Sequence, residues 1–162
     1  MSVKVKIENL QQFKSNLKGY VNQFADKKQQ QQVLRPGAVI LRNAAKKLVP
    51  KSDKDHFYYR KGKKTKILSG NLQNSMYVYR ESTGEVSVGP RVLRKIQGLD
   101  TIGNNPKNSS GYYSHMIYKG ATQFRDKITG TALISNLTKI NAAMARAVER
   151  VNNRIAKKYG LQ

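Results

Sequence analysis

The chain has 162 residues, and its 31 Lys and Arg against 9 Asp and Glu give a formal net charge of +22. That length suits one domain with a buried core, and the lack of cysteine excludes disulfides and thiolate metal sites. The charge favours an anionic partner, either nucleic acid, acidic protein or membrane lipid. No apolar run approaches the roughly 18 residues of a membrane span, and the start MSVKVKIENL lacks a secretory core.

The N-terminal part predicts a strand followed by a helix. Residues 3–7, VKVKI, alternate apolar and basic side chains as a short amphipathic strand does. The apolar spacing then becomes helical, which predicts a helix from about residue 9 to the mid-twenties. Its apolar stripe consists of Leu10, Phe13, Leu17, Tyr20, Val21 and Phe24. The tract KKQQQQ that follows is polar on every side, so it is either a solvated helical extension or a linker.

A second helix is expected after Arg35-Pro36-Gly37, because proline is tolerated in a first turn but not inside a helix. Its apolar stripe runs from Ile40 to Leu48. Lys46 and Lys47 would occupy its last turn, where cations suit the helix dipole. Pro50 marks its end.

The middle of the chain predicts a mobile loop, a capped turn and a hairpin. Residues 51–67 lack periodicity and are strongly basic, so we interpret them as a loop. Ser69 can cap the helical turn that follows, because its hydroxyl can accept an unpaired amide hydrogen. Residues 76–90 then alternate apolar and polar side chains around an STG turn, which predicts a β-hairpin.

The last third begins with a polar, irregular loop at 91–111. The segment 112–122 is too short to assign. Apolar residues from Leu133 to Ile155 recur every three or four positions, which predicts a helix of ~40 Å at 1.5 Å per residue. We expect its stripe to cover a small sheet rather than to form an intermolecular coiled coil.

The order of elements predicts a single α+β domain over residues 1–162. A small antiparallel sheet, made of the N-terminal strand and the hairpin, would be covered by the N-terminal helices and the long C-terminal helix.

Side chains suited to catalysis are scarce. His56 and His115 are the only histidines, and neither has a carboxylate at a recognisable spacing. Walker and dinucleotide patterns are absent. We therefore expect no enzyme, no cofactor and no metal. One enzymatic alternative is a nuclease that uses Asp53, Asp55 and His56 with a divalent metal, although these acids are expected to bond to loop backbone.

Short landmarks follow one another in a fixed order along the chain. They are Ala45-Lys46, Pro50, Ser69-Gly70-Asn71-Leu72, Ser75, Val88-Gly89-Pro90, Tyr113, His115, Gly120 and Thr122. Over residues 1–155 this combination resembles the small neck or tail-completion proteins, also called head-tail joining or minor tail proteins, of long-tailed bacteriophages. That family commonly has threonine where this chain has Ser69.

The resemblance implies a structural virion protein and no reaction. Its copies would assemble in the host cytoplasm into a ring, six-fold by the resemblance, that joins the head connector to the tail. The implied partners are other copies of the chain, the connector, and the tail-tube or terminator proteins, with no membrane. The residues expected to maintain the motif are Pro50, Ser69, Gly70, Leu72, Ser75, Gly89, Gly120 and Thr122.

Cations in the loops 51–67 and 91–111 would then contact either packaged DNA or the acidic surface of a neighbouring ring. These cations are Lys51, Lys54, Arg60, Lys61, Lys63, Lys64, Lys66, Arg91, Arg94 and Lys95. A charge run more often forms a solvated loop that keeps a monomer soluble. The main alternative function is sequence-independent nucleic-acid binding of the ribosomal or nucleoid type, although the chain has no RNA-recognition, KH or helix-turn-helix signature.

Overall fold

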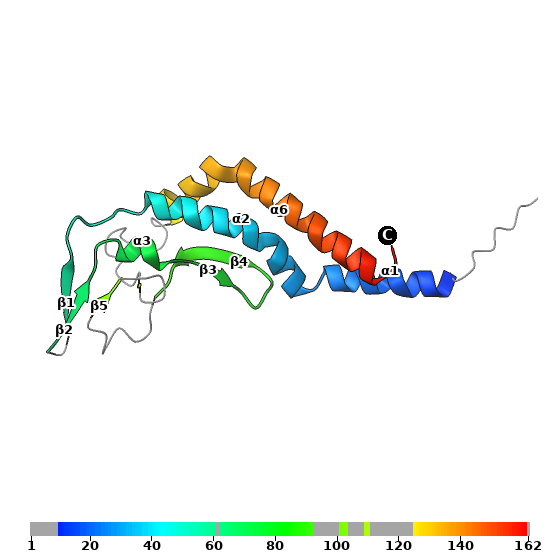
Figure 1. The fold of residues 1–162 in the computed structure, drawn as a ribbon, viewed down its shortest axis with the longest axis horizontal. Coiled ribbons are helices and arrows are strands. Elements are labelled where there is room, and N and C mark those ends of the chain that lie inside the picture. Colours follow the sequence, from blue (N-terminus) through cyan, green and yellow to red (C-terminus); the bar gives the residue numbers. More distant parts are fainter. Residues whose placement is uncertain (1–9, 61, 93–100, 104–108, 111–124, 162) are drawn as a thin grey trace, which may run out of the picture.

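Our computed structural model describes residues 10–60, 62–92, 101–103, 109–110 and 125–161. Long helices lie towards both ends of the chain, and short strands lie between them in sequence (Figure 1). The helices are α1 (Leu10–Phe24), α2 (Lys27–Leu48), α3 (Asn71–Ser75) and α6 (Thr131–Lys158), with a π-helical turn, η2 (Arg125–Gly130), before α6. The strands are β1 (His56–Arg60), β2 (Lys63–Ile67), β3 (Met76–Arg80), β4 (Val86–Pro90) and β5 (Thr101–Ile102).

Helix α2 begins well before the proline at which a second helix was expected. Asp26 caps it, and its carboxylate accepts a hydrogen bond from the amide of Lys28 at 2.8 Å. The KKQQQQ tract is therefore helical, and the prediction that Arg35-Pro36-Gly37 separates two helices is wrong. The helix continues through Pro36 despite the lost amide hydrogen bond because this stretch packs along α6. It ends at Leu48, as predicted from Pro50.

Helix α2 is the middle layer of the fold. The contact between α2 and α6 is more extensive than that between any other two described elements. Helix α2 also contacts both strands of the β3–β4 hairpin (Figure 1). Helix α6 therefore forms the outer layer beyond α2. The core cluster between these layers consists of Ala45, Val49, Leu72, Met76, Ile128 and Ala132.

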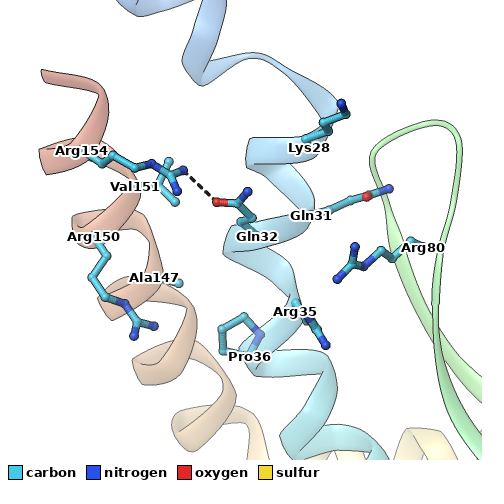
Figure 2. Close-up of a pocket in the computed structure, with 10 residues that line it drawn as sticks. All are labelled: Lys28, Gln31, Gln32, Arg35, Pro36, Arg80, Ala147, Arg150, Val151 and Arg154. Carbon is cyan, nitrogen blue, oxygen red and sulfur yellow. Dashed lines mark hydrogen bonds between the residues drawn. The ribbon is translucent and has the colours of Figure 1, made fainter. Parts of the chain in front are cut away.

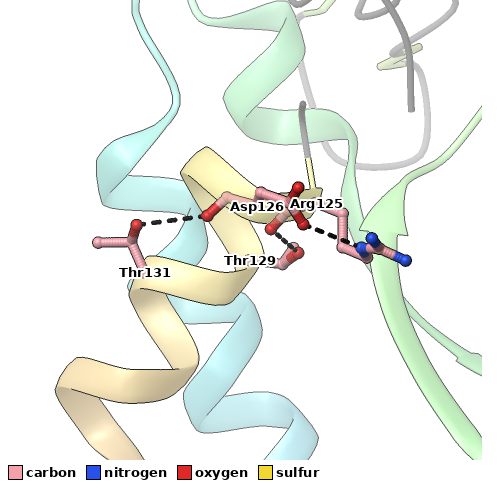
Figure 3. Close-up of polar contacts among 4 residues, drawn as sticks. All are labelled: Arg125, Asp126, Thr129 and Thr131. Carbon is pink, nitrogen blue, oxygen red and sulfur yellow. Dashed lines mark hydrogen bonds and ion pairs between the residues drawn. The ribbon is translucent and has the colours of Figure 1, made fainter. Parts of the chain in front are cut away.

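The π-helical turn η2 leads into α6 and places buried Ile128 in that core. The hydroxyl of Thr129 donates to the carbonyl of Arg125 at 2.7 Å, and the hydroxyl of Thr131 makes a longer contact to the carbonyl of Asp126 (Figure 3). A π-helical turn departs from the regular α-helical hydrogen-bond pattern. The two threonine hydroxyls supply donors to carbonyls of this turn.

The hairpin predicted for residues 76–90 is confirmed. Strands β3 and β4 pair antiparallel, with Met76 opposite Pro90 and Arg80 opposite Val86. Gly84 in the turn has a φ of 101°, a region that favours glycine. A Cβ atom there would lie 2.5 Å from Oε1 of Gln30, so the turn lies directly against α2.

The prediction that residues 51–67 form a mobile loop is wrong. Strands β1 and β2 pair antiparallel within this segment, and the short β5 adds to β2 in parallel. Thr65 and Ile67 are buried and alternate with the lysines of the sequence KTKI. Buried and exposed residues therefore alternate here as they do in a strand. The alternation did not predict a strand because it is short and because the buried Thr65 is polar.

The fold is α+β, as predicted, with a long C-terminal helix. The strand expected at 3–7 and the segment 112–122 lie outside the described residues. Of the loop 91–111, the described part includes β5 and the fully buried Ser109 and Ser110. Among the described helices, none combines the length and apolar character that crossing a bilayer requires.

Glycine at position 37 allows α2 and α6 to pack closely. A Cβ atom there would lie 2.9 Å from Cγ of Met144 and 3.0 Å from Cγ2 of Ile140. We predict that Gly37→Leu destabilises the protein, because overpacking at such short distances costs about 3 kcal/mol. This outweighs the roughly 1 kcal/mol gained by replacing a helical glycine. Urea unfolding measures the free energy of unfolding of the variant and of the wild-type protein.

The matched control is Ala145→Leu, which adds the same side chain at an exposed position of α6. It should change the free energy of unfolding by less than about 0.5 kcal/mol. Equal losses in the two variants would contradict close packing at Gly37.

Candidate interaction site

The motif segment, residues 69–75, joins the end of α2 to the strands. The side-chain amide of Gln73 donates to the carbonyl of Val49, the C-cap of α2, at 2.8 Å. The backbone amide of Ser69 donates to a carboxylate oxygen of Asp55 at 2.9 Å, just before β1. Because α2, the β1–β2 sheet and the β3–β4 hairpin all meet this segment, it fixes their relative positions.

Ser69 does not cap the helical turn, so that prediction is wrong. Gly70 occupies the N-cap position of α3 with a left-handed φ of 77° and makes no side-chain cap. The Ser69 hydroxyl instead donates to the carbonyl of Ser52. Ser69 therefore ties the segment after α2 to the motif.

Asn71 is the polar centre of the motif. Its side chain is 1 % exposed, and it donates to the carbonyl of Ser110 at 2.6 Å while accepting from the Ser110 amide at 2.9 Å. Gly103 lies so close that a Cβ atom there would be 2.7 Å from Cβ of Asn71. Asn71 thus holds two points of the loop 91–111. It was not among the predicted motif residues, although it lies between Gly70 and Leu72.

We predict that Asn71→Ala lowers stability by about 1–3 kcal/mol for each Ser110 backbone group that stays unsatisfied. Amide hydrogen exchange at Ser110 should accelerate in parallel, because its acceptor is gone. Asn74→Ala is the control, since the half-buried Asn74 makes one longer bond, 3.2 Å, to the carbonyl of Gly103. If Ser110 exchange were unchanged in Asn71→Ala, the anchoring role would be excluded.

The β1–β2 hairpin carries several of the predicted contact cations, and two of them interact with other side chains of the same molecule. Nζ of Lys64 lies 3.9 Å from the ring centroid of Phe57. Nζ of Lys66 lies 3.1 Å from the carboxylate of Asp55. Lys51 and Lys54 are exposed beside the hairpin. This surface is therefore basic and folded.

The other predicted residues occupy different settings. Arg60 lies in β1 and Lys63 in β2. Arg91 is half-buried 5.7 Å from the ring centroid of Tyr77. Pro50 is exposed after α2, Leu72 and Ser75 are buried, and Gly89 lies in β4. Outside the described residues lie Lys61, Arg94, Lys95, Gly120 and Thr122.

Asp55 has a lowered pKa, first because it accepts the Ser69 amide hydrogen bond and second because Lys66 lies beside it. A carboxyl group whose pKa is lowered by folding stabilises the folded state above its unfolded pKa. Asp55 therefore contributes at neutral pH, and this contribution is lost as the pH falls through its folded pKa.

We predict that Lys66→Gln leaves the pKa of Asp55 below its ordinary value, because the stronger cause, the Ser69 amide, remains. Carboxyl NMR titration measures this pKa. Lys54→Gln removes a nearby exposed cation that Asp55 does not contact and should leave the pKa unchanged. A full return to the ordinary value in Lys66→Gln would assign the shift to the ion pair instead.

The nuclease alternative needs Asp53, Asp55 and His56 around a shared metal. The carboxylate of Asp55 already accepts a hydrogen bond from the Ser69 amide and lies beside Lys66. Nε2 of His56 lies 2.6 Å from the hydroxyl of Ser52. Within the part of the chain that the structure describes, no group of three His, Cys, Asp or Glu side chains could hold a metal ion.

Helix α1 presents an unburied apolar stripe. It consists of Leu10, Phe13, Leu17 and Val21, all exposed, with Val21 at 55 %. The helix contacts α6 through a different face, where Asn16 donates to the carbonyl of Tyr159 at 2.9 Å and Gly19 lies against its ring. At 3.6 residues per turn, the stripe lies about a third of a turn from that face. The expected helix is confirmed, and of its predicted stripe Tyr20 and Phe24 are half-buried near α6 whereas the other four residues are exposed.

The first turns of α6 carry a second exposed stripe. It consists of Leu133, Ile134 and Leu137, with Ile134 at 79 % exposure. Ile140, Ala147, Val151 and Ile155 are buried on the same helix. From Ile140 onward the predicted stripe of α6 is therefore buried or half-buried except at Val148, and its first turns present apolar side chains to solvent.

Comparison with known proteins gives no relative: the chain matches no protein-family model, no curated protein and no solved structure.

Proposed function

We propose that this chain is a structural virion protein of the phage neck, whose copies form a ring that joins the head connector to the tail. The observation that carries the proposal is the pair of exposed apolar stripes on α1 and on the first turns of α6. Figure 1 shows these two segments at opposite ends of the α2–α6 layer. The ordered landmarks from Ala45 to Thr122 supply the assignment to the neck.

Two different apolar patches at opposite ends suit a head-to-tail contact between copies. In such a heterologous contact the α1 stripe of one subunit covers the α6 stripe of the next, and the series closes into a ring when the rotation fits. Each fully covered Leu, Val or Phe contributes about 1.5–3 kcal/mol. The resemblance implies six subunits.

The basic β1–β2 hairpin lies at the end of the fold away from α1 (Figure 1). In a ring it is available to dock on the acidic surface of a connector, tail-tube or terminator protein, or on packaged DNA. Exposed Lys51, Lys54 and Lys64 carry this part of the proposal. Complementary fields of this kind direct assembly as well as strengthen it.

We predict that Phe13→Gln/Leu17→Gln abolishes ring formation, because it removes the centre of the α1 stripe without changing charge. The folded monomer should keep its melting temperature, since both side chains are exposed. Light scattering after size exclusion and electron microscopy measure the oligomer. Gln11→Ala/Ser15→Ala, at exposed polar positions of the same helix, is the control and should leave the ring intact.

Two results would contradict the proposal. One is a wild-type protein that stays monomeric at every concentration and salt level tested. The other is a ring that forms equally well in Phe13→Gln/Leu17→Gln. Tight nucleic-acid binding by a chain that never assembles would instead favour the nucleic-acid-binding alternative.

A further inference from the structure

An open cleft of about 720 Å³ lies between α2, α6 and the β3–β4 hairpin (Figure 2). Its cations come from three different elements. They are Lys28 and Arg35 of α2, Arg80 of β3, and Arg150 and Arg154 of α6. None of the described residues that line it is acidic. None of these cations was among the predicted contact residues, because they are far apart in sequence and only the fold brings them together.

The walls of the cleft are held by packing that does not involve its cations. The side chain of Gln31 donates to the carbonyl of Glu81 at 2.6 Å, and Gly84 lies against α2, so the hairpin wall is fixed. The close contact at Gly37 fixes α6. Buried Ala147 and Val151 line the cleft on the α6 side.

The charge of the cleft is not neutralised by the described residues. Arg154 donates to the side-chain oxygen of Gln32 (Figure 2) and also to that of Gln29. These bonds orient its guanidinium without cancelling its charge. Among the described residues, the side chains of Arg35, Arg80 and Arg150 make no hydrogen bond or ion pair. In Figure 2, Arg80 reaches from the hairpin towards α2.

We propose that this cleft binds a run of consecutive phosphate groups, as in a nucleic-acid strand or a free polyphosphate. Cations gathered beside buried apolar side chains repel one another, and an anion that bridges them relieves this repulsion. The cleft is of the size that small-ligand sites have, about 300–1,000 Å³.

Phosphate fits this arrangement better than the carboxylates of an acidic protein segment. A guanidinium fork matches one planar carboxylate, and that pairing uses both of its oxygens from one side. A phosphate is tetrahedral and directs its acceptor oxygens several ways. It can therefore accept from arginines that approach from the helix α6, the helix α2 and the hairpin together.

The test measures binding of the full chain to four probes at several salt concentrations. They are inorganic tripolyphosphate, a 20-nucleotide single strand of DNA, the corresponding duplex, and a polyglutamate peptide. We expect tripolyphosphate or the DNA probes to bind, with an affinity that falls as salt rises because each phosphate contact releases counterions.

The decisive variant is Arg80→Gln/Arg150→Gln. Each lost charged hydrogen bond weakens phosphate binding about tenfold or more, so the pair should lose on the order of a hundredfold. The slope of log affinity against log salt should fall by about 1.5. Lys139→Gln/Arg146→Gln removes the same charge at exposed positions of α6 that do not line the cleft, and it should change affinity by less than about threefold if the cleft is the site.

Binding of tripolyphosphate that competes with the DNA strand supports a nucleic-acid strand as the occupant, whereas binding of tripolyphosphate alone supports a free phosphate compound. Equal losses in the two double variants would overturn the proposal, as would polyglutamate binding as tightly as DNA through the same arginines. A melting-temperature measurement on both variants establishes that they are folded.

This inference does not depend on the proposed function. Apolar ring contacts between chains of charge +22 should strengthen with salt, because salt screens their mutual repulsion. Phosphate binding should weaken with salt. The two can therefore fail separately: Arg80→Gln/Arg150→Gln tests the cleft, and Phe13→Gln/Leu17→Gln tests the ring.

Discussion

The packing of α2 between α6 and the β3–β4 hairpin is the interaction on which the rest of the structure depends. Gly37 allows the helices to approach, and Ala45 and Val49 bring the end of α2 into the core. The hairpin is placed by the opposite part of α2, through Gln31 and the turn at Gly84. Because one helix positions both neighbours, the cationic cleft and the exposed stripe of α6 acquire fixed places relative to one another.

The periodic spacing of apolar residues predicted several helices and strands from the sequence, but it did not predict which distant residues contact one another. The helices at 10–24 and 131–158 and the hairpin at 76–90 follow from apolar spacing that local contacts enforce. The continuation of α2 through Pro36 depends on packing against α6, which overrides a local preference. Likewise, the strands in 56–67 are anchored by burial of Thr65 and Ile67. The hydrogen bonds of Asn71 join positions that no local pattern connects.

The sequence indicated how much charge there was but not where it gathers. The cations expected to contact a partner included Lys66, which is paired with Asp55, and Arg91, which is half-buried beside Tyr77. The cationic cleft instead unites residues from three elements that are far apart in sequence. The two kinds of surface have different physical characters, since apolar stripes favour contacts that salt strengthens and the cleft favours contacts that salt weakens.

In the proposed function, copies of this chain form a closed layer of a virion neck. Cryo-electron microscopy of particles from the phage proposed to encode the chain would test this directly. We expect a ring between connector and tail tube whose density fits the α2–α6 pair, with α1 of each subunit lying on the first turns of α6 of the next. Purified particles that contain none of this polypeptide would contradict it.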